Sequence, residues 1–370
     1  MSDVLVPFVD LKQRFAEERE ELLSAVTDVL ERGDLIGGAA VTDFEAAAAS
    51  YAGAAHCIAL NSGTDALMMG MMAAGIRRGD EVITPPNSFV ASTASIAHIG
   101  ATAVFCDVGE DQNIDPARIE ALITPRTRAI MPVHWTGRMC DMETISAIAE
   151  THGLLVIEDS AQSMGAYRNG RHGGTWGVVG AFSAHPLKNL NAVGDGGFLF
   201  TQSAEIAERL RRYRNHGLAD RNTCLEWGVN SRLDTIHAAV LLHRLRRLDD
   251  VIERRRRNVE LYRSLLVQDD LFIPPYDPQQ SDAHVMFIIQ CERRDELHAH
   301  LTQSGVQSLI YYRRPIHLQP AAAALGYRKG DMPVAERQAE RVLALPHHQH
   351  LSPEQIEMTA NAVNAFYGRS

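Results

Sequence analysis

One lysine stands out in the segment 181–197, where apolar residues surround it and a glycine-rich turn follows it. An amine becomes nucleophilic when burial disfavours its ammonium form, and a neutral lysine can then condense with an aldehyde. Because lysines are seldom buried, a solvated loop lysine is the alternative for Lys188. The apolar neighbours that favour a buried amine are Phe182, Pro186, Leu187 and Leu190.

A carboxylate stands upstream, at the expected end of a strand. The run 154–157 is wholly apolar and leads into Glu158 and Asp159, a pattern typical of a buried parallel strand whose carboxyl end faces a ligand crevice. There, Asp159 can pair with the ring nitrogen of pyridoxal phosphate and keep it protonated, so that the ring can accept electrons from a carbanion. A helix N-cap or a loop salt bridge is the alternative for Asp159.

The segment Asn61–Leu67 reads as a turn between a strand and a helix. The backbone N–H groups of Gly63 and Thr64, with the Thr64 hydroxyl, can hold a phosphate dianion at the helix start. An ordinary capping sequence explains this motif equally well when it stands alone. Followed by an acid at a strand tip and a lysine before Gly-Asp-Gly-Gly, it indicates a cofactor site.

Together these motifs resemble those of the pyridoxal-phosphate-dependent sugar aminotransferases of the DegT/DnrJ/StrS type, within the aspartate aminotransferase fold group. The set of Asp159, Lys188 and the turn 194–197 is the most specific part of the resemblance. Residues 185–191 depart from the commoner Pro-Ser/Thr-Lys spelling, which leaves the sugar open. The resemblance covers essentially the whole chain, through segments 7–11, 61–67, 86–92, 157–162, 181–197, 230–234, 315–319 and 345–348.

The resemblance implies a role for each residue of the cofactor site. Lys188 forms the Schiff base with the cofactor and then transfers the proton between the amino donor and the cofactor, and Asp159 pairs with the pyridine nitrogen. Gln162 contacts the phenolic oxygen, Ser183 contacts the phosphate, and Phe89 stacks on the ring. Taken singly, the last three residues would be a surface glutamine, a strand serine bonded to backbone, and a core phenylalanine.

The resemblance also implies a homodimer with shared active sites. Asn230 matches the asparagine that reaches the cofactor phosphate of the neighbouring subunit. Four further residues match less uniform positions near the substrate, namely His185, Arg232, Tyr312 and His317.

For the fold, the resemblance implies the α/β type I transferase architecture, with a mostly parallel central sheet covered by helices. Alternating strand and helix patterns agree with such a sheet, and no GxGxxG motif supports a dinucleotide-binding domain. We expect a large cofactor-binding domain over 1–245 and a smaller α+β domain over 246–370, with the first ~30 residues packed on the smaller domain. Apolar spacing predicts helices over 22–32, 44–52, 115–123 and 235–266.

Bulk composition excludes several classes of protein. With 370 residues, 45% hydrophobic content and a net charge of -10, the chain can bury a large core and is unsuited to general nucleic-acid binding. No leader or membrane-spanning run is present, which predicts a cytoplasmic protein without membrane attachment. Arg254–Arg257 are interpreted as a solvated helix face, and the histidines of 346–350 as lacking the partner ligands of a metal site.

We therefore expect an aminotransferase that moves an amino group from L-glutamate, through pyridoxamine phosphate, to a nucleotide-linked keto-deoxyhexose. The same chemistry on a keto-octulosonate or a keto-inositol is the first alternative. The alternative of another class is a non-catalytic regulator that keeps the fold to bind the cofactor or a sugar. The intact pair of Lys188 and Asp159 favours the enzyme.

Overall fold

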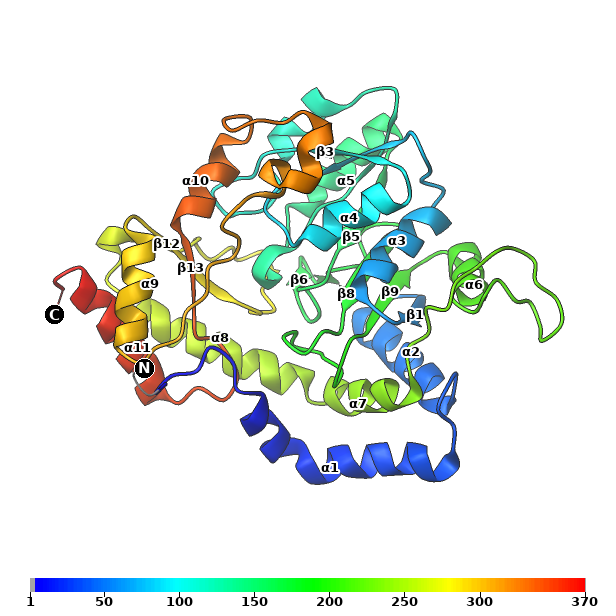
Figure 1. Cartoon of the computed structure of the whole chain (residues 1–370), viewed down its shortest axis with the longest axis horizontal. Coiled ribbons are helices and arrows are strands. Elements are labelled where there is room, and N and C mark those ends of the chain that lie inside the picture. The colour runs from blue at the N-terminus through cyan, green and yellow to red at the C-terminus, as the bar shows by residue number, and fades with distance from the viewer. Residues whose placement is uncertain (1–3, 370) are drawn as a thin grey trace.

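A central sheet of seven strands organises the larger part of the molecule (Figure 1). The computed structural model describes residues 4–369. The strands of this sheet are β1 (His56–Leu60), β2 (Glu81–Thr84), β3 (Thr102–Phe105), β4 (Thr127–Ile130), β5 (Leu155–Asp159), β8 (Val179–Ser183) and β9 (Gly197–Thr201). Their order is β1-β9-β8-β5-β4-β2-β3. Only β9 runs antiparallel to its neighbours, so the expected mostly parallel sheet is confirmed.

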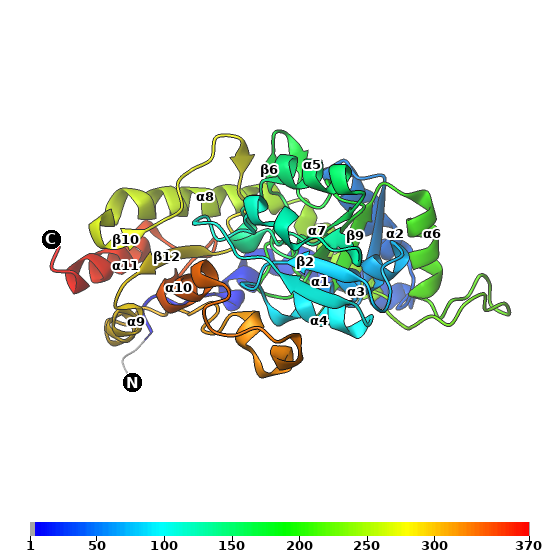
Figure 2. The same cartoon turned by 90° about the horizontal axis from the view of Figure 1, so that it is seen from above.

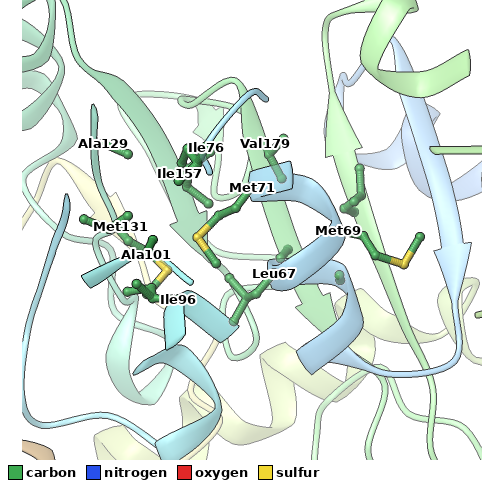
Figure 3. Close-up of a cluster of buried hydrophobic side chains, with 14 of the residues drawn as sticks. Leu67, Met69, Met71, Ile76, Ile96, Ala101, Ala129, Met131, Ile157 and Val179 are labelled. Atoms are coloured by element: carbon green, nitrogen blue, oxygen red, sulfur yellow. The ribbon is translucent and has the colours of Figure 1, made fainter. Parts of the chain in front are cut away.

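Helices bury both faces of this sheet, which explains why its strands are apolar at nearly every position. On one face, Ile58 and Leu60 of β1 pack in a cluster with α3 (Gly63–Ala73), α4 (Val90–His98) and α6 (Ala204–Tyr213). Figure 3 shows Leu67 and Met71 of α3 in this cluster with Ile157 and Val179 of the strands. The other face packs on α2 (Ala39–Ala52), α5 (Met142–His152) and α7 (Thr235–Leu245).

A smaller antiparallel sheet follows in the C-terminal part of the chain. It is formed by β10 (Leu271–Phe272), β12 (Phe287–Cys291) and β13 (Val342–Leu345). Around it lie α8 (Leu248–Leu265), α9 (Arg294–Gln303), α10 (Pro333–Arg341) and α11 (Pro353–Phe366). In Figure 2, α8 runs from this part of the molecule toward the large sheet. The strands β6 (Tyr167–Arg168), β7 (Arg171–His172) and β11 (Gln280–Ser281) form a third, short sheet.

The N-terminal segment contacts both parts of the molecule. Helix α1 (Leu11–Arg32) lies along α7 of the larger part (Figure 1). Just before it, Val6 is fully buried and pairs with Val306 beside the small sheet. The division at 245/246 stays a prediction, and it falls in the short break between α7 and α8.

All four helices expected from apolar spacing have different bounds or a different form, and α2 begins at Ala39 and not at 44. Helix α1 begins at Leu11 and not at 22, because Asp10 caps it by accepting a hydrogen bond from the Gln13 N–H at 2.8 Å. The segment 115–123 forms two short 3₁₀ turns, and the pattern over 235–266 is broken at Arg246 and Arg247. Within residues 4–369, no helix has the length and apolar composition needed to cross a bilayer.

Candidate active site

A cavity of about 360 Å³ lies where the carboxyl ends of β5 and β8 meet the start of α3 and loops of the C-terminal part. Its position follows from the parallel sheet, whose strand ends leave a crevice for ligands. Most of the site residues expected from the sequence line it, namely Gly63, Thr64, Phe89, Asp159, Gln162, Ser183, His185, Lys188 and Tyr312. Asn230, Arg232 and His317 do not line this cavity of their own chain.

Lys188 lies in the loop that joins β8 to β9. This loop is closed at its base, where the Ala184 N–H donates to the Gly196 carbonyl at 2.8 Å and the Ala192 N–H donates to the Ala184 carbonyl at 2.7 Å. Burial lowers the pKa of the Lys188 amine to about 8, and the Asp159 carboxylate opposes that shift. A larger fraction of this amine is therefore neutral near pH 8 than of a solvated lysine.

Asp159 ends β5 with its side chain 5% exposed. Its Oδ2 accepts a hydrogen bond from the Ser92 hydroxyl at 2.6 Å, and its Oδ1 accepts one from the Ala161 N–H at 3.2 Å. Burial raises the pKa of the carboxyl, while the bond from Ser92 acts in the opposite direction. Ser92 in turn lies 2.6 Å from the hydroxyl of Ser88. The carboxylate is thus fixed in place by two donors.

The start of α3 offers a site for an anion. The first turn of a helix leaves its N–H groups without intrahelical acceptors, and the helix dipole adds a partial positive charge there. Ser62 caps the helix by accepting from the Asp65 N–H at 3.1 Å. A Cβ on Gly63 would lie 2.8 Å from the Cβ of Ser183, so glycine is needed for the helix start to contact the end of β8. Gly63, Thr64 and Ser183 therefore face the cavity together.

Aromatic and amide side chains complete the cavity wall. Gln162 is held by its Oε1, which accepts from the Thr136 N–H at 2.6 Å. Phe89 precedes α4 and is 60% exposed, and the Tyr312 ring lies 6.3 Å from it. Burial raises the pKa of the Tyr312 phenol, which keeps its proton. An exposed phenylalanine in a cavity offers a face on which a planar ring can stack.

Arginines from two helices hold the loop that carries Lys188. Arg14 of α1 donates to the Asn189 carbonyl at 3.2 Å, and Arg244 of α7 donates to the Asn191 carbonyl at 2.8 Å. Glu18 of α1 forms ion pairs with both arginines. Buried hydrogen bonds from two charged arginines therefore hold the loop that carries Lys188 in place.

Three expected residues lie elsewhere. Asn230 accepts a hydrogen bond from Arg232 Nε at 3.1 Å in the loop before α7. His317 is 1% exposed, lies 3.0 Å from a carboxylate oxygen of Glu336 and packs beside Phe105. The structure thus brings none of these three residues to the cavity of the same chain.

The sequence interpretation did not name several residues that line the cavity, among them Ser92, His134, Arg255 and His347. Ser92 stands at the end of the motif 86–92, but nothing in the motif indicates that its hydroxyl contacts Asp159. The interpretation of Arg254–Arg257 as a solvated face is wrong for Arg255, which is 5% exposed. Helical spacing in the sequence could have indicated that Arg255 is buried. It lies four residues before Val259 and seven before Tyr262, and both of these are buried.

The donor set fits pyridoxal phosphate. The cavity combines an amine of lowered pKa for the aldehyde, a fixed carboxylate for the ring nitrogen and a helix start for the phosphate. Among residues 4–369, no group of three or more histidine, cysteine or acidic side chains is arranged to hold a metal ion.

Two curated relatives match nearly the whole chain. The dTDP-3-amino-3,4,6-trideoxy-alpha-D-glucose transaminase of Streptomyces venezuelae is 40% identical, over 98% of this chain and 97% of the relative. A protein of Geobacillus stearothermophilus named as a pleiotropic regulatory protein is also 40% identical, over 98% of both chains.

Solved structures and a family model agree with these relatives. The structure of DesV from S. venezuelae superimposes with a TM-score of 0.96 and 40% identity, over 99% of both chains. NtdA from Bacillus subtilis, solved with its bound cofactor PMP, gives a TM-score of 0.92 and 28% identity, over 100% of this chain and 86% of NtdA. The family model matches residues 16–364. The chain belongs to the DegT/DnrJ/EryC1/StrS aminotransferase family, whose members are pyridoxal-phosphate-dependent sugar aminotransferases.

Proposed function

We propose that the protein transfers an amino group from L-glutamate to the ketone of a nucleotide-linked keto-deoxyhexose. The observation that carries this proposal is that Lys188 and Asp159 line one cavity at the ends of neighbouring strands. The name of the Streptomyces relative, a dTDP-sugar transaminase, supports the nucleotide-linked acceptor. A cytoplasmic location remains a prediction from the sequence.

Lys188 has two tasks in this proposal. Its neutral amine would hold the cofactor through the aldehyde group and, when free, would move the proton between the amino donor and the cofactor. A pKa near 8 suits both tasks, because an amine that titrates near working pH can both accept and return a proton.

Asp159 holds the proton on the ring nitrogen. When bound, the protonated pyridine ring supplies the electron sink for the carbanion at the donor Cα. The hydrogen bond from Ser92 favours the ionised carboxylate, which opposes the effect of burial. A neutral Asp159 could not stabilise the ring-nitrogen proton by charge.

The remaining cavity residues orient the cofactor. The N–H groups of Gly63 and Thr64 and the hydroxyl of Ser183 bind the phosphate, and Phe89 packs on the ring. Gln162 contacts the phenolic oxygen through its amide, whose carbonyl is already held by the Thr136 N–H. The start of α3 and Asp159 would hold the two ends of the cofactor, and Lys188 of the same cavity would supply the amine for its aldehyde.

A second copy of the chain completes the site in this proposal. Asn230 reaches the phosphate of the partner subunit, while Arg232, His185 and Tyr312 contact substrate groups. His317, which is 1% exposed and lies 3.0 Å from Glu336, is left out of this proposal. The loop that follows α6 extends away from the body of the molecule (Figure 1) and carries Trp227, which is 91% exposed. The same loop also carries Leu225, which is 62% exposed, and a group of exposed apolar side chains marks a surface that a partner can bury.

A regulatory protein is the second candidate, because the Geobacillus relative is named as one. The test is to convert the protein to its pyridoxamine form and offer a panel of keto sugars and nucleotide sugars, with a keto-octulosonate and a keto-inositol as the alternative acceptors. Return of the cofactor's original absorbance identifies the acceptor, and Lys188→Ala serves as the inactive control. A protein that binds cofactor but exchanges no amino group with L-glutamate or with any other amino acid would exclude the enzyme.

A further inference from the structure

Arg255 differs from every other buried arginine among residues 4–369. Its side chain has no carboxylate within ion-pair distance, whereas each of the others does. The other buried arginines are Arg14, Arg138, Arg168, Arg244 and Arg294.

All the acceptors of Arg255 within the chain are neutral. Nη1 donates to the carbonyls of Val285 at 3.0 Å and His347 at 3.2 Å, with a longer bond to His284 at 3.4 Å. Nη2 donates to Oε1 of Gln349 at 3.1 Å, and Nε has no partner among the described residues. Burial and the neighbouring Arg14 lower the pKa of the guanidinium to about 9. A buried cation without a counter-ion is costly, so this site is suited to an anion.

The cavity that holds Lys188 and Asp159 is also lined by Arg255. Beside it on the wall stands His347, whose Nδ1 has no partner among the described residues. These side chains are attached to α8 and to the loop before α11, while the phosphate-binding turn is at the start of α3. The cavity therefore offers a second anion position, built on a different part of the chain from the first.

We propose that Arg255 binds the α-carboxylate of the amino donor, an inference that rests on the proposed function. A guanidinium pairs with a planar carboxylate through parallel N–H groups. The carboxylate is one bond from the carbon whose proton Lys188 removes, so its binding group must share the cavity with Lys188. The diphosphate of a nucleotide sugar is separated from the reacting ketone by the sugar ring, and it needs a position nearer the cavity mouth.

The test changes the proposed binding residue in the protein and, separately, removes the charge of the α-carboxylate from the amino donor. Arg255→Gln is compared with Arg256→Gln, an adjacent arginine that is exposed and paired with Glu253 and Glu260. The amino donors are L-glutamate, its α-amide isoglutamine, and L-glutamine. The cofactor absorbance reports the first half-reaction with each donor. In the wild type, the α-amide should lower kcat/KM by ~10- to 100-fold, the usual range for a charged hydrogen bond.

For Arg255→Gln, we expect kcat/KM with L-glutamate to fall by the same factor. The kcat/KM of this variant with the α-amide should be little lower than with L-glutamate. Arg256→Gln should keep the wild-type pattern. An undiminished α-amide penalty in Arg255→Gln, or a rise in the KM of the sugar alone, would overturn the proposal, and the second result would place a substrate phosphate at Arg255. Arg255→Lys, which keeps the charge but loses the paired N–H groups, is used if Arg255→Gln does not fold, and it should lose part of the α-amide penalty.

A binding measurement separates this inference from the proposed function. Glutarate should raise the Tm of the cofactor-loaded wild type and of Arg256→Gln, but not that of Arg255→Gln, because a ligand that binds only the folded state stabilises it. Equal stabilisation of all three proteins would refute the anion site. A wild type that is stabilised by glutarate but never reacts with any amino acid would refute the proposed function and leave the anion site standing.

Discussion

Glu18 and Arg244, 226 residues apart in the chain, form a buried ion pair beneath the loop that carries Lys188. Glu18 is 4% exposed and Arg244 is 7% exposed. The same carboxylate also lies 3.8 Å from Arg14, so one acid neutralises two arginines. Because both arginines donate to carbonyls of the loop, helix α1 is part of the support of the active site.

Replacing Glu18 by glutamine should destabilise the protein by roughly 3 kcal/mol, since it leaves two buried cations without a counter-ion. We also expect kcat to fall, because the two arginines that anchor the loop of Lys188 lose the carboxylate that fixes their position. Denaturant unfolding and steady-state kinetics measure the two effects. Glu17→Gln is the matched control, because Glu17 is about 29% exposed and its loss should cost about 1 kcal/mol or less. Equal effects of the two substitutions would contradict the support role.

The reaction of the apoprotein with pyridoxal phosphate should depend on pH through Lys188. Burial lowers the pKa of this amine to about 8, so the neutral fraction is about one tenth at pH 7 and about one half at pH 8. The rate of cofactor capture should rise with pH and level off above about 8, where a solvated lysine would continue to gain reactivity toward 10.5. Stopped-flow absorbance measures this rate, with Lys188→Ala as the background.

Asp159→Asn gives a second check on the same titration. The Asp159 carboxylate raises the pKa of the Lys188 amine, so its removal should move the midpoint to lower pH. A midpoint that moves to higher pH, or does not move, would mean that the two groups do not interact in the cavity.

Ser92→Ala should weaken catalysis by changing the ionisation of Asp159. The Ser92 hydroxyl donates to the carboxylate at 2.6 Å and lowers its pKa, so without it the pKa rises and the ionised form is lost at a higher pH. The acid limb of the kcat profile should therefore move to higher pH, with a loss of ~10-fold on that limb for a charged hydrogen bond.

Two serine variants separate this effect from general damage to α4. Ser92→Thr keeps a hydroxyl and should restore the profile. Ser95→Ala removes a buried hydroxyl of the same helix that donates to the Ala91 carbonyl at 2.7 Å and to the Thr64 carbonyl at 3.3 Å. Because this hydroxyl does not contact Asp159, the acid limb should stay where it is. If Asp159→Asn retained full kcat, the role of this carboxylate would be wrong altogether.

Mixing two inactive variants should restore activity if each site is built from two chains. In a mixed dimer of Lys188→Ala and Asn230→Trp, one of the two sites combines an intact Lys188 with an intact Asn230. Equal subunits that exchange at random should recover about a quarter of the wild-type activity, because half of the dimers are mixed.

Subunit exchange is verified with differently tagged chains, and each variant alone gives the baseline. Exchange without recovered activity would confine the site to one chain or remove Asn230 from it. In the isolated chain, Asn230 lies outside the cavity, so the outcome depends on the partner.

The sequence by itself determined the parts of this protein that depend on local chemistry. The apolar run before Asp159 and the glycine-bounded turn at Gly63 indicated a strand end and a helix start, and both elements are present. The alternation of strand and helix patterns also agreed with a largely parallel sheet, which the structure confirms. The order of the motifs and the family resemblance assigned Asp159 and Lys188 to one cofactor site, and both residues line the same cavity.

Only the tertiary structure decided which polar groups are buried and what they contact. The contacts of Ser92 with Asp159, and of Glu18 with Arg244, join residues far apart in the chain, and no local pattern encodes such pairs. Within one run of arginines, Arg255 alone faces inward, because its position on α8 coincides with the buried stripe of Val259 and Tyr262. Residue type predicts solvation only on average, whereas packing against a particular neighbour decides the individual case.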